Sequence, residues 1–312
     1  MVARYGVKAI VALAVTLLIW STTFAAQRAG LAYFDPGHLV LLRWGAAALL
    51  LLAYGSVTGM RAPARRDLPA VFLAGALGFG VYQIALAYGQ TGISAGTAGL
   101  LINLSPVSTL VIAALLRLET VSGRMWAGLA VSFAGLLMLG LARDGFGGSP
   151  AHAALVVFAA ASFGGYVHVT KLLLRRYTPL EVTTYAICAG VLPFGVWAPG
   201  SVTAVVSAPL AGQLTLAYLA LFPAAIAYVT WSRAIAVLPG SVAARGLYLV
   251  PVAGLAVAWA WLGEVPSAMA VVGGLVVIAG VVFASGSPSH SHLATVSPAP
   301  ESESAHPVAS AA

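Results

Sequence analysis

The sequence predicts an all-α integral membrane protein in which ten transmembrane helices form two inverted five-helix repeats. Three observations lead to this prediction: an apolar composition, the length of the apolar segments, and a pattern that occurs twice. Of the 312 residues, 61% are hydrophobic and 7% are charged, and the mean hydropathy is +0.98. A soluble domain carries about 25% charged residues, so we expect this chain to face lipid rather than water.

The apolar segments have the length of about 20 residues that a helix needs to cross a bilayer, whereas a β-barrel would show alternating segments of about 10 residues. The first segment follows two basic residues, as in a signal peptide. It extends through Trp20 and nine similar segments follow, which favours a membrane span. Short connections leave no room for a soluble catalytic domain. The predicted spans cover about residues 8–26, 37–55, 69–89, 97–116, 122–141, 152–171, 180–198, 211–231, 243–262 and 267–285.

The basic residues predict the orientation of these spans. With the N-terminus inside, all of the 15 Lys and Arg residues except Arg28, Arg43 and Arg143 fall on the cytoplasmic side, as the positive-inside rule requires. Both termini are then cytoplasmic, because the number of spans is even. The net charge of +7 is therefore a topology signal. It does not indicate a nucleic-acid partner, which needs a basic patch on a soluble surface.

A sequence pattern occurs twice, 145 residues apart. "LSPVSTLVIAALLRLE" (104–119) aligns Pro106 and Glu119 with Pro251 and Glu264 of "LVPVAGLAVAWAWLGE" (249–264). Upstream, "DPGHLV" (35–40) resembles "TPLEVT" (178–183) at an offset of 143. The same offset of 145 relates Gly128 and Gly135 to Gly273 and Gly280.

The pattern indicates that spans one to five are duplicated as spans six to ten. Because five is odd, the second copy crosses the membrane in the opposite sense. Inverted halves with a site near the midplane are typical of secondary transporters. We therefore predict a first repeat over residues 1–141, a second over 152–285, and a disordered cytoplasmic tail over 286–312.

With these motifs, the chain resembles the EamA-type branch of the drug/metabolite transporter superfamily over about residues 7–285. The resemblance rests on "LLIWSTTFAAQ", on "LLRWGAAALLLL" and on the Pro, Glu, Gly, Gly order found in each half. It implies ten helices, cytoplasmic termini and a cavity formed mainly by spans 1, 3, 4, 6, 8 and 9. It also implies export or exchange of amino acids or other small metabolites, without fixing one substrate. Leu118 departs from the pattern, since Gly is commoner before this Glu.

Polar and aromatic residues inside the spans are the candidates for substrate binding. In span one, Thr16, Trp20, Thr23 and Gln27 share one helical face, which we expect to face the interior, either against another helix or in the cavity. At an offset of 143 this face corresponds to Ala159, Phe163, Tyr166 and Thr170 of span six. The alternative for the tyrosines is the aromatic belt at the membrane interface. The candidates are Trp20, Thr23, Tyr82, Gln83, Asn103, Tyr166, Tyr228, Trp231 and Tyr248.

Pro106 and Pro251 lie inside apolar spans, where a proline removes a backbone hydrogen bond and kinks the helix. They are predicted to be hinges, or else bends required for packing. Glu119 and Glu264 lie at span boundaries. We expect them to cap the next helix through its N-terminal dipole, with proton transfer as the alternative.

Two arginines are candidates for gating or boundary roles. Arg43 lies within span two, where it can snorkel outward, pair with Asp35 or bind a substrate carboxylate. Arg245 opens span nine and is expected to be a boundary charge or to line the mouth of the cavity.

The candidate cavity has rings, hydroxyls and amides but no carboxylate, which suits a neutral or zwitterionic solute with an apolar part. We therefore predict a multi-pass cytoplasmic (inner) membrane transporter that exports or exchanges such metabolites, amino acids for example, by alternating access. Nucleosides, amines or drugs are alternative substrates, and a passive channel or a membrane scaffold is an alternative function. No catalytic cluster, metal-ligand spacing or ATP-binding loop is present in the sequence, so we expect no enzyme activity, no metal and no cofactor. A monomer would suffice, with the substrate and the bilayer as partners.

Overall fold

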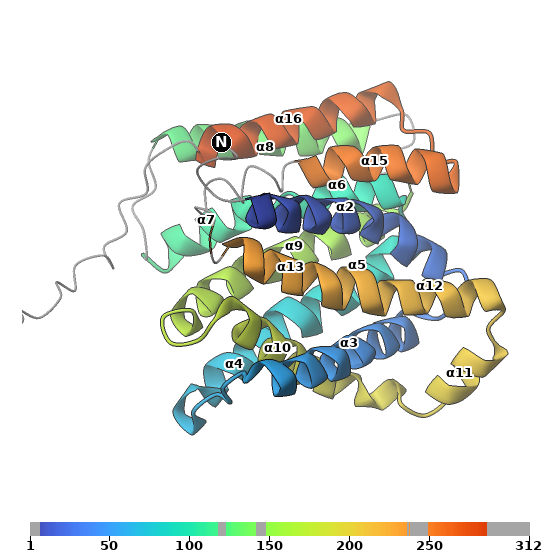
Figure 1. The fold of residues 1–312 in the computed structure, drawn as a ribbon. Helices are drawn as coiled ribbons and strands as arrows, with labels where there is room; N and C mark the ends of the chain where they lie inside the picture. The colour runs from blue at the N-terminus through green and yellow to red at the C-terminus, as the bar shows by residue number, and fades with distance from the viewer. Residues whose placement is uncertain (1–6, 118–122, 142–147, 236, 238–248, 286–312) are drawn as a thin grey trace, which may run out of the picture.

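The computed structural model describes residues 7–117, 123–141, 148–235, 237 and 249–285. Every regular element within these residues is a helix, as the sequence predicts (Figure 1). The elements are α2 (Val7–Gly30), α3 (Pro36–Thr58), η1 (Arg65–Asp67), α4 (Leu68–Gly75), η2 (Ala76–Val81), α5 (Tyr82–Thr91), α6 (Ala95–Ile102), α7 (Ser105–Leu115), α8 (Gly123–Leu141), α9 (Pro150–Leu173), α10 (Pro179–Val191), η3 (Leu192–Trp197), α11 (Ser201–Ser207), α12 (Leu210–Leu221), η4 (Phe222–Ile226), α13 (Ala227–Ile235), α15 (Leu249–Leu262) and α16 (Ala268–Ser285).

Seven helical segments within the described residues are long and apolar enough to cross a membrane. Three further apolar helices, over 126–138, 253–262 and 271–283, are shorter. Leu18, Leu49 and Val57 are among many large apolar side chains exposed on the outside, as expected of a surface that meets lipid. The seven segments span 7–30, 36–58, 65–91, 95–115, 150–173, 179–197 and 210–234.

The matching motifs "DPGHLV" and "TPLEVT" both start helices. Asp35 caps α3 by accepting hydrogen bonds from the backbone N–H groups of Gly37 (3.0 Å) and His38 (3.2 Å). Thr178 and Glu181 form a capping box on α10, in which each side chain accepts from the backbone of the other residue. A proline follows each cap, at a position where its missing N–H costs nothing.

Pro106, one of the two prolines predicted to kink a span, lies directly after a break between two helices. Span four divides at Asn103 and Leu104, and Pro106 lies at the start of α7. Pro106 has no N–H to donate to the Ile102 carbonyl, and this carbonyl accepts from the Ser105 hydroxyl instead (2.6 Å). Span four is therefore interrupted next to its proline, and a hinge motion there stays a prediction. Pro251 lies in α15, whose described part begins at Leu249, and its effect on span nine stays a prediction.

Two π-helical segments, η2 and η4, interrupt the long helices over 65–91 and 210–234. They begin 146 residues apart, at Ala76 and Phe222, and so lie at matching places in the two halves. The sequence did not predict them. Such segments occur mostly as single turns inside α-helices, and frequently at functional sites.

Helices of the two halves pack against each other throughout the molecule (Figure 1). The first helix of the first half, α2, contacts α13 and α15 of the second, and α9 contacts α5 and α7 of the first. At one end of the molecule α3 lies beside α10. The His38 Nε2 atom is 3.3 Å from the Pro199 carbonyl oxygen, and the Arg61 backbone N–H donates to Glu181 (2.8 Å). Each of these helices therefore begins where the other ends, and they run antiparallel.

At the opposite end, α8 and α16 meet through the four glycines of the repeat (Figure 1). A Cβ atom on Gly135 would lie 2.7 Å from the Gly273 carbonyl oxygen, and one on Gly280 would lie 2.6 Å from the Gly128 carbonyl oxygen. Both separations are too short for a side chain. Small residues thus let the two backbones approach closely, as at many helix contacts in membranes.

Candidate substrate-binding site

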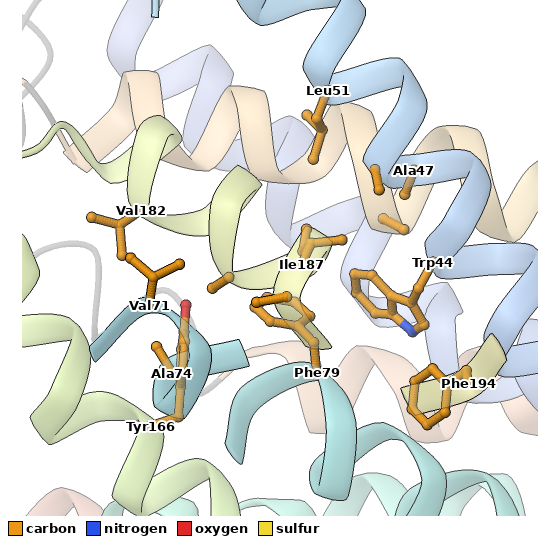
Figure 2. Close-up of a cluster of buried hydrophobic side chains, with 14 of the residues drawn as sticks. Trp44, Ala47, Leu51, Val71, Ala74, Phe79, Tyr166, Val182, Ile187 and Phe194 are labelled. Atoms are coloured by element: carbon orange, nitrogen blue, oxygen red, sulfur yellow. The ribbon is translucent and has the colours of Figure 1, made fainter. Parts of the chain in front are cut away.

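Aromatic side chains from both halves meet in the interior. Phe79 lies between Trp44 and Tyr166, with ring centroids 5.1 and 5.7 Å away (Figure 2). The Tyr228 ring contacts Trp20 (5.5 Å), Phe79 (5.9 Å) and Trp44 (6.1 Å). These separations are typical of favourable edge-to-face or tilted ring pairs. Residues of α2, α3, η2, α9 and α13 thereby form one continuous group.

The group extends in two further directions. Trp231 lies 5.3 Å from Trp20, and Tyr82 lies 5.2 Å from Phe163, whose ring is also 5.2 Å from Tyr166. We call the following side chains the aromatic cluster: Trp20, Trp44, Phe79, Tyr82, Phe163, Tyr166, Tyr228 and Trp231.

Five of the predicted substrate-binding residues, Trp20, Tyr82, Tyr166, Tyr228 and Trp231, are members of the aromatic cluster. Their rings contact other rings of the cluster, as a site between the halves would require. Their role toward a substrate stays a prediction. Trp44 and Phe79 were not predicted, since an apolar ring in an apolar span carries no signal of its own. Phe163 lies on the face of span six that corresponds to Trp20.

Three other candidates, Thr23, Gln83 and Asn103, make no ring contact with the cluster among the described residues. The Thr23 hydroxyl donates to the Ile19 carbonyl within α2 (3.4 Å), and the Asn103 amide donates to the Gly99 carbonyl (2.6 Å). Local bonds of this kind satisfy a side chain within its own helix. Gln83 is buried beside Tyr82. Tyr248 lies outside the described residues, so its place in the site stays a prediction.

The polar face of span one does face the interior, as predicted. The hydroxyl oxygens of Thr16 and Thr230 are 2.7 Å apart, which joins α2 to α13. One turn further along, the Trp20 indole N–H donates to the Pro223 carbonyl in η4 (3.3 Å). Gln27, at the far end of the face, is buried. This face therefore packs against the second half of the chain along most of its length.

Each π-helical segment offers a carbonyl to the first helix of the other half. The Leu77 carbonyl of η2 accepts from the Ser162 hydroxyl of α9 (2.8 Å), and the Pro223 carbonyl of η4 accepts from Trp20 of α2. These matching bonds lie beside the aromatic cluster, since Phe79 and Tyr228 lie within or next to the same segments. They tie each π-helical segment to a helix of the other half.

Arg43 is buried, with a relative exposure of 4%, and does not reach the surface. It donates to the Gln27 side-chain oxygen (2.6 Å), and its guanidinium lies 4.8 Å from the centre of the Trp44 ring. Asp35 instead pairs with His38 on the first turn of α3. Two of the three predicted roles for Arg43, snorkelling and pairing with Asp35, are therefore wrong. Burial among interior side chains prevents both.

Glu264 caps a helix, but not the one expected. Its carboxylate accepts hydrogen bonds from the backbone N–H groups of Ala95 (2.9 Å) and Gly96 (3.4 Å) at the start of α6. The expected partner was α16, which follows it in sequence. The exposed N–H groups at the start of a helix attract an anion from any direction, and here α6 is the helix within reach. Glu119 and Arg245 lie outside the described residues.

A hollow of about 280 Å³ lies apart from the aromatic cluster, where α8 meets α9. It is lined by Leu136, Pro150, Ala153, Ala154 and Val157. These side chains are apolar and provide nothing that would orient a polar substrate. The aromatic cluster therefore remains the candidate site.

Comparison with known proteins identifies related sequences over most of the chain. A family described as the EamA-like transporter family matches residues 7–141 and 151–286. A protein of Streptantibioticus cattleyicolor named "Probable terminal-alkyne amino-acid exporter" is 40% identical, over 88% of this chain and 93% of its own. "Uncharacterized transporter YdfC" of Bacillus subtilis is 31% identical, over 85% and 87%. "Uncharacterized inner membrane transporter YedA" of Escherichia coli K12 is 29% identical, over 75% and 76%.

The fold itself also occurs in a known crystal structure. That structure is 21% identical in sequence and superposes with a TM-score of 0.58, covering 88% of this chain and 96% of the other. At this identity the likeness establishes the fold and nothing about a ligand.

Proposed function

Because the chain belongs to the EamA-like transporter family, we propose that this multi-pass membrane transporter exports or exchanges small neutral or zwitterionic metabolites, and that amino acids are its substrates. The Streptantibioticus cattleyicolor relative is named as an amino-acid exporter, and it covers most of this chain at 40% identity. Because that name specifies terminal-alkyne amino acids, we propose amino acids with a small apolar side chain.

We further propose that the chain consists of two inverted repeats related by a pseudo-two-fold axis. The matching glycine contacts between α8 and α16 support this arrangement, since the pair Gly135 and Gly273 becomes Gly280 and Gly128 when the halves are exchanged. A second exchanged pair involves the first helices. A Cβ atom on Gly164 would lie 2.8 Å from the backbone nitrogen of Thr109. In the corresponding contact, a Cβ atom on Gly254 would lie 3.3 Å from the carbonyl oxygen of Ser21. Contacts that map onto each other in this way are what a two-fold axis produces.

Two matching ring contacts carry the proposal of transport. Trp20 of α2 contacts Tyr228 of α13, and Phe163 of α9 contacts Tyr82 of α5. At offsets of 143 and 146, Trp20 corresponds to Phe163 and Tyr228 to Tyr82, so each contact is a copy of the other. In both, the first helix of one half closes on the third helix of the other half.

Paired contacts of this kind are suited to alternating access. Separation of α2 from α13 opens the first ring contact, and separation of α9 from α5 opens the second. In inverted repeats such motions lead to opposite sides of the membrane. With the orientation that the basic residues predict, both termini are cytoplasmic, which fits a family that includes inner membrane transporters by name.

The chemistry of the aromatic cluster favours a solute with an apolar body. Rings surround such a body, and a few polar groups at the edge fix its orientation. A sugar phosphate would require several clustered cations, and the cluster contacts Arg43 alone among the described cations. Nucleosides and simple amines are the alternative substrate classes, and the experiment that follows distinguishes them from amino acids.

Counterflow in proteoliposomes tests this function. Vesicles are preloaded with unlabelled L-propargylglycine, which carries a terminal alkyne, and entry of the labelled compound is followed with and without a pH gradient. Pools of nucleosides and of small amines run in parallel. We expect only amino-acid pools to accelerate entry. Uptake that no internal pool accelerates would indicate a channel, and acceleration by nucleosides or amines alone would assign a different substrate class.

A further inference from the structure

Arg43 carries a buried charge without a carboxylate partner among the described residues. An ionised group in the interior is costly unless it is paired, and the only described hydrogen-bond partner of this guanidinium is the neutral side chain of Gln27. The described carboxylates are all engaged at helix ends. Asp35 binds His38, Asp67 binds Arg176, Glu181 binds the Arg61 and Thr178 backbones, and Glu264 binds Ala95.

Three hydrogen-bond donors around this charge are buried and have no acceptor within the part of the chain that the structure describes. They are Nε of Arg43, Nε2 of Gln27 and Nε1 of Trp44. The three side chains are in contact, because Gln27 accepts from Arg43 and the guanidinium lies 4.8 Å from the Trp44 ring centre. Buried donors are almost always paired. This small region therefore has an excess of donors together with an excess positive charge.

A carboxylate would correct both excesses. It has two oxygens that only accept hydrogen bonds, and the planar fork of an arginine binds it through two parallel bonds. One negative charge balances the one cation. A phosphate ester, with nearly two charges, would require a second cation, and no second described cation contacts this region.

We propose that Gln27, Arg43 and Trp44 form a carboxylate-binding subsite of the transport site, which recognises the carboxylate of the amino acid; this rests on the function proposed above. The subsite is continuous with the aromatic cluster through the Trp44 ring, which contacts Phe79 and Tyr228. A substrate held by its carboxylate thus places its apolar body against rings of both halves.

No described carboxylate faces the cluster to bind an ammonium group. The electron-rich faces of Tyr and Trp rings attract a cation through their quadrupoles, and they are the groups available there. The subsite therefore discriminates mainly on the acid group. A carboxylic acid without an amine is expected to bind, whereas an amide or an amine of the same size is not.

The first test measures anion binding without transport. The unfolding temperature of the purified protein in detergent is followed with rising butyrate, with butyramide as the uncharged control of the same size. We expect butyrate to raise the unfolding temperature in a saturable manner and butyramide to leave it unchanged. Equal effects of the two compounds would overturn the subsite.

Two substitutions test the residues, with one matched control. Arg43→Gln removes the charge. Gln27→Glu places a carboxylate within the protein next to Arg43, where it pairs with the guanidinium and excludes the substrate. Arg28→Gln, the control, removes a cation at the same end of α2 that binds the Gln90 and Thr91 carbonyls instead.

We expect Gln27→Glu to fold at least as well as the wild type, to lose the butyrate effect and to reduce counterflow of L-propargylglycine at least tenfold. Arg43→Gln should also lose the butyrate effect and the counterflow, whereas Arg28→Gln should keep the butyrate effect and the counterflow. A purely structural role of Arg43 predicts the opposite for Gln27→Glu, namely full transport. Normal apparent affinity for L-propargylglycine in a folded Gln27→Glu protein would thus overturn the proposal.

The outcomes also separate the subsite from the transport function. If no amino acid shows counterflow in the wild type, the proposed function fails, while a butyrate effect that Gln27→Glu abolishes would still support an anion site. If counterflow proceeds and the primary amide of L-propargylglycine competes as well as the acid, the subsite fails while the transport function stands.

Discussion

The carboxylate of Glu264 accepts a hydrogen bond from the backbone N–H of Ala95, at 2.9 Å. Ala95 is the first residue of α6 in the first half of the chain, whereas Glu264 follows α15 in the second half. The bond therefore joins the halves at a helix N-terminus, where unpaired N–H groups and the helix dipole favour a negative charge. This geometry favours a structural role for Glu264 over proton transfer.

We expect Glu264→Ala to lower the free energy of unfolding by about 1 kcal/mol, the usual cost of losing a helix cap. Glu264→Gln should lower the free energy of unfolding by less, because an amide oxygen still accepts a hydrogen bond from the Ala95 N–H. Thermal unfolding of the purified proteins measures both changes. Neither substitution should alter the response of counterflow to a pH gradient. A variant that keeps its stability but loses that response would identify Glu264 as the proton carrier.

Side chains at the contact between α8 and α16 should be poorly tolerated. Gly135→Ala and Gly280→Ala each place a methyl group against a backbone carbonyl of the other helix. We expect each to destabilise the protein by about 1–3 kcal/mol, as overpacking does in other tightly packed interiors. Thermal unfolding in detergent provides the measurement.

The control for these variants is Gly45→Ala, because nothing lies within 4 Å of the added Cβ atom on α3. Alanine is the better helix former, so this variant should be as stable as the wild type or slightly more so. Equal effects at all three glycines would contradict a tight glycine contact between α8 and α16.

Two substitutions of Tyr228 separate the contribution of its ring to stability and transport from the contribution of its hydroxyl. The ring contacts Trp20, Trp44 and Phe79, and Tyr228→Ala removes all three contacts. Truncation of a buried aromatic residue costs about 3–5 kcal/mol, so we expect a large fall in unfolding temperature together with loss of counterflow. Tyr228→Phe keeps the ring and should keep the stability. If Tyr228→Ala unfolds at the wild-type temperature, the cluster does not hold the halves together.

The predicted orientation is open to a cysteine-labelling experiment. Cys188 is the only cysteine in the sequence, so Cys188→Ser provides a cysteine-free background. Arg65→Cys and Thr203→Cys introduce exposed thiols near opposite ends of the antiparallel pair α3 and α10. In intact cells, a membrane-impermeant maleimide should label position 203 and spare position 65. Labelling of position 65 alone would mean that the termini are outside.

The sequence by itself determined the class of the protein and much of its local structure. A segment of about 20 apolar residues must satisfy its own backbone in lipid, so it forms a helix regardless of its neighbours. The caps at Asp35 and Thr178 are also local, because their partners lie within the next three residues. The inward direction of the face bearing Thr16 and Trp20 followed from periodicity alone.

Only the tertiary structure decided which helices share the site. Hydropathy in a membrane protein identifies spans but does not identify their partners, since lipid and helix interior are equally apolar. Trp44 and Phe79 join the aromatic cluster because α3 and η2 are brought against α13. The carbonyls of η2 and η4 find donors because Ser162 and Trp20 lie on helices of the other half. Arg43 meets Gln27 and not Asp35, because long-range packing, rather than distance along the chain, places its neighbours.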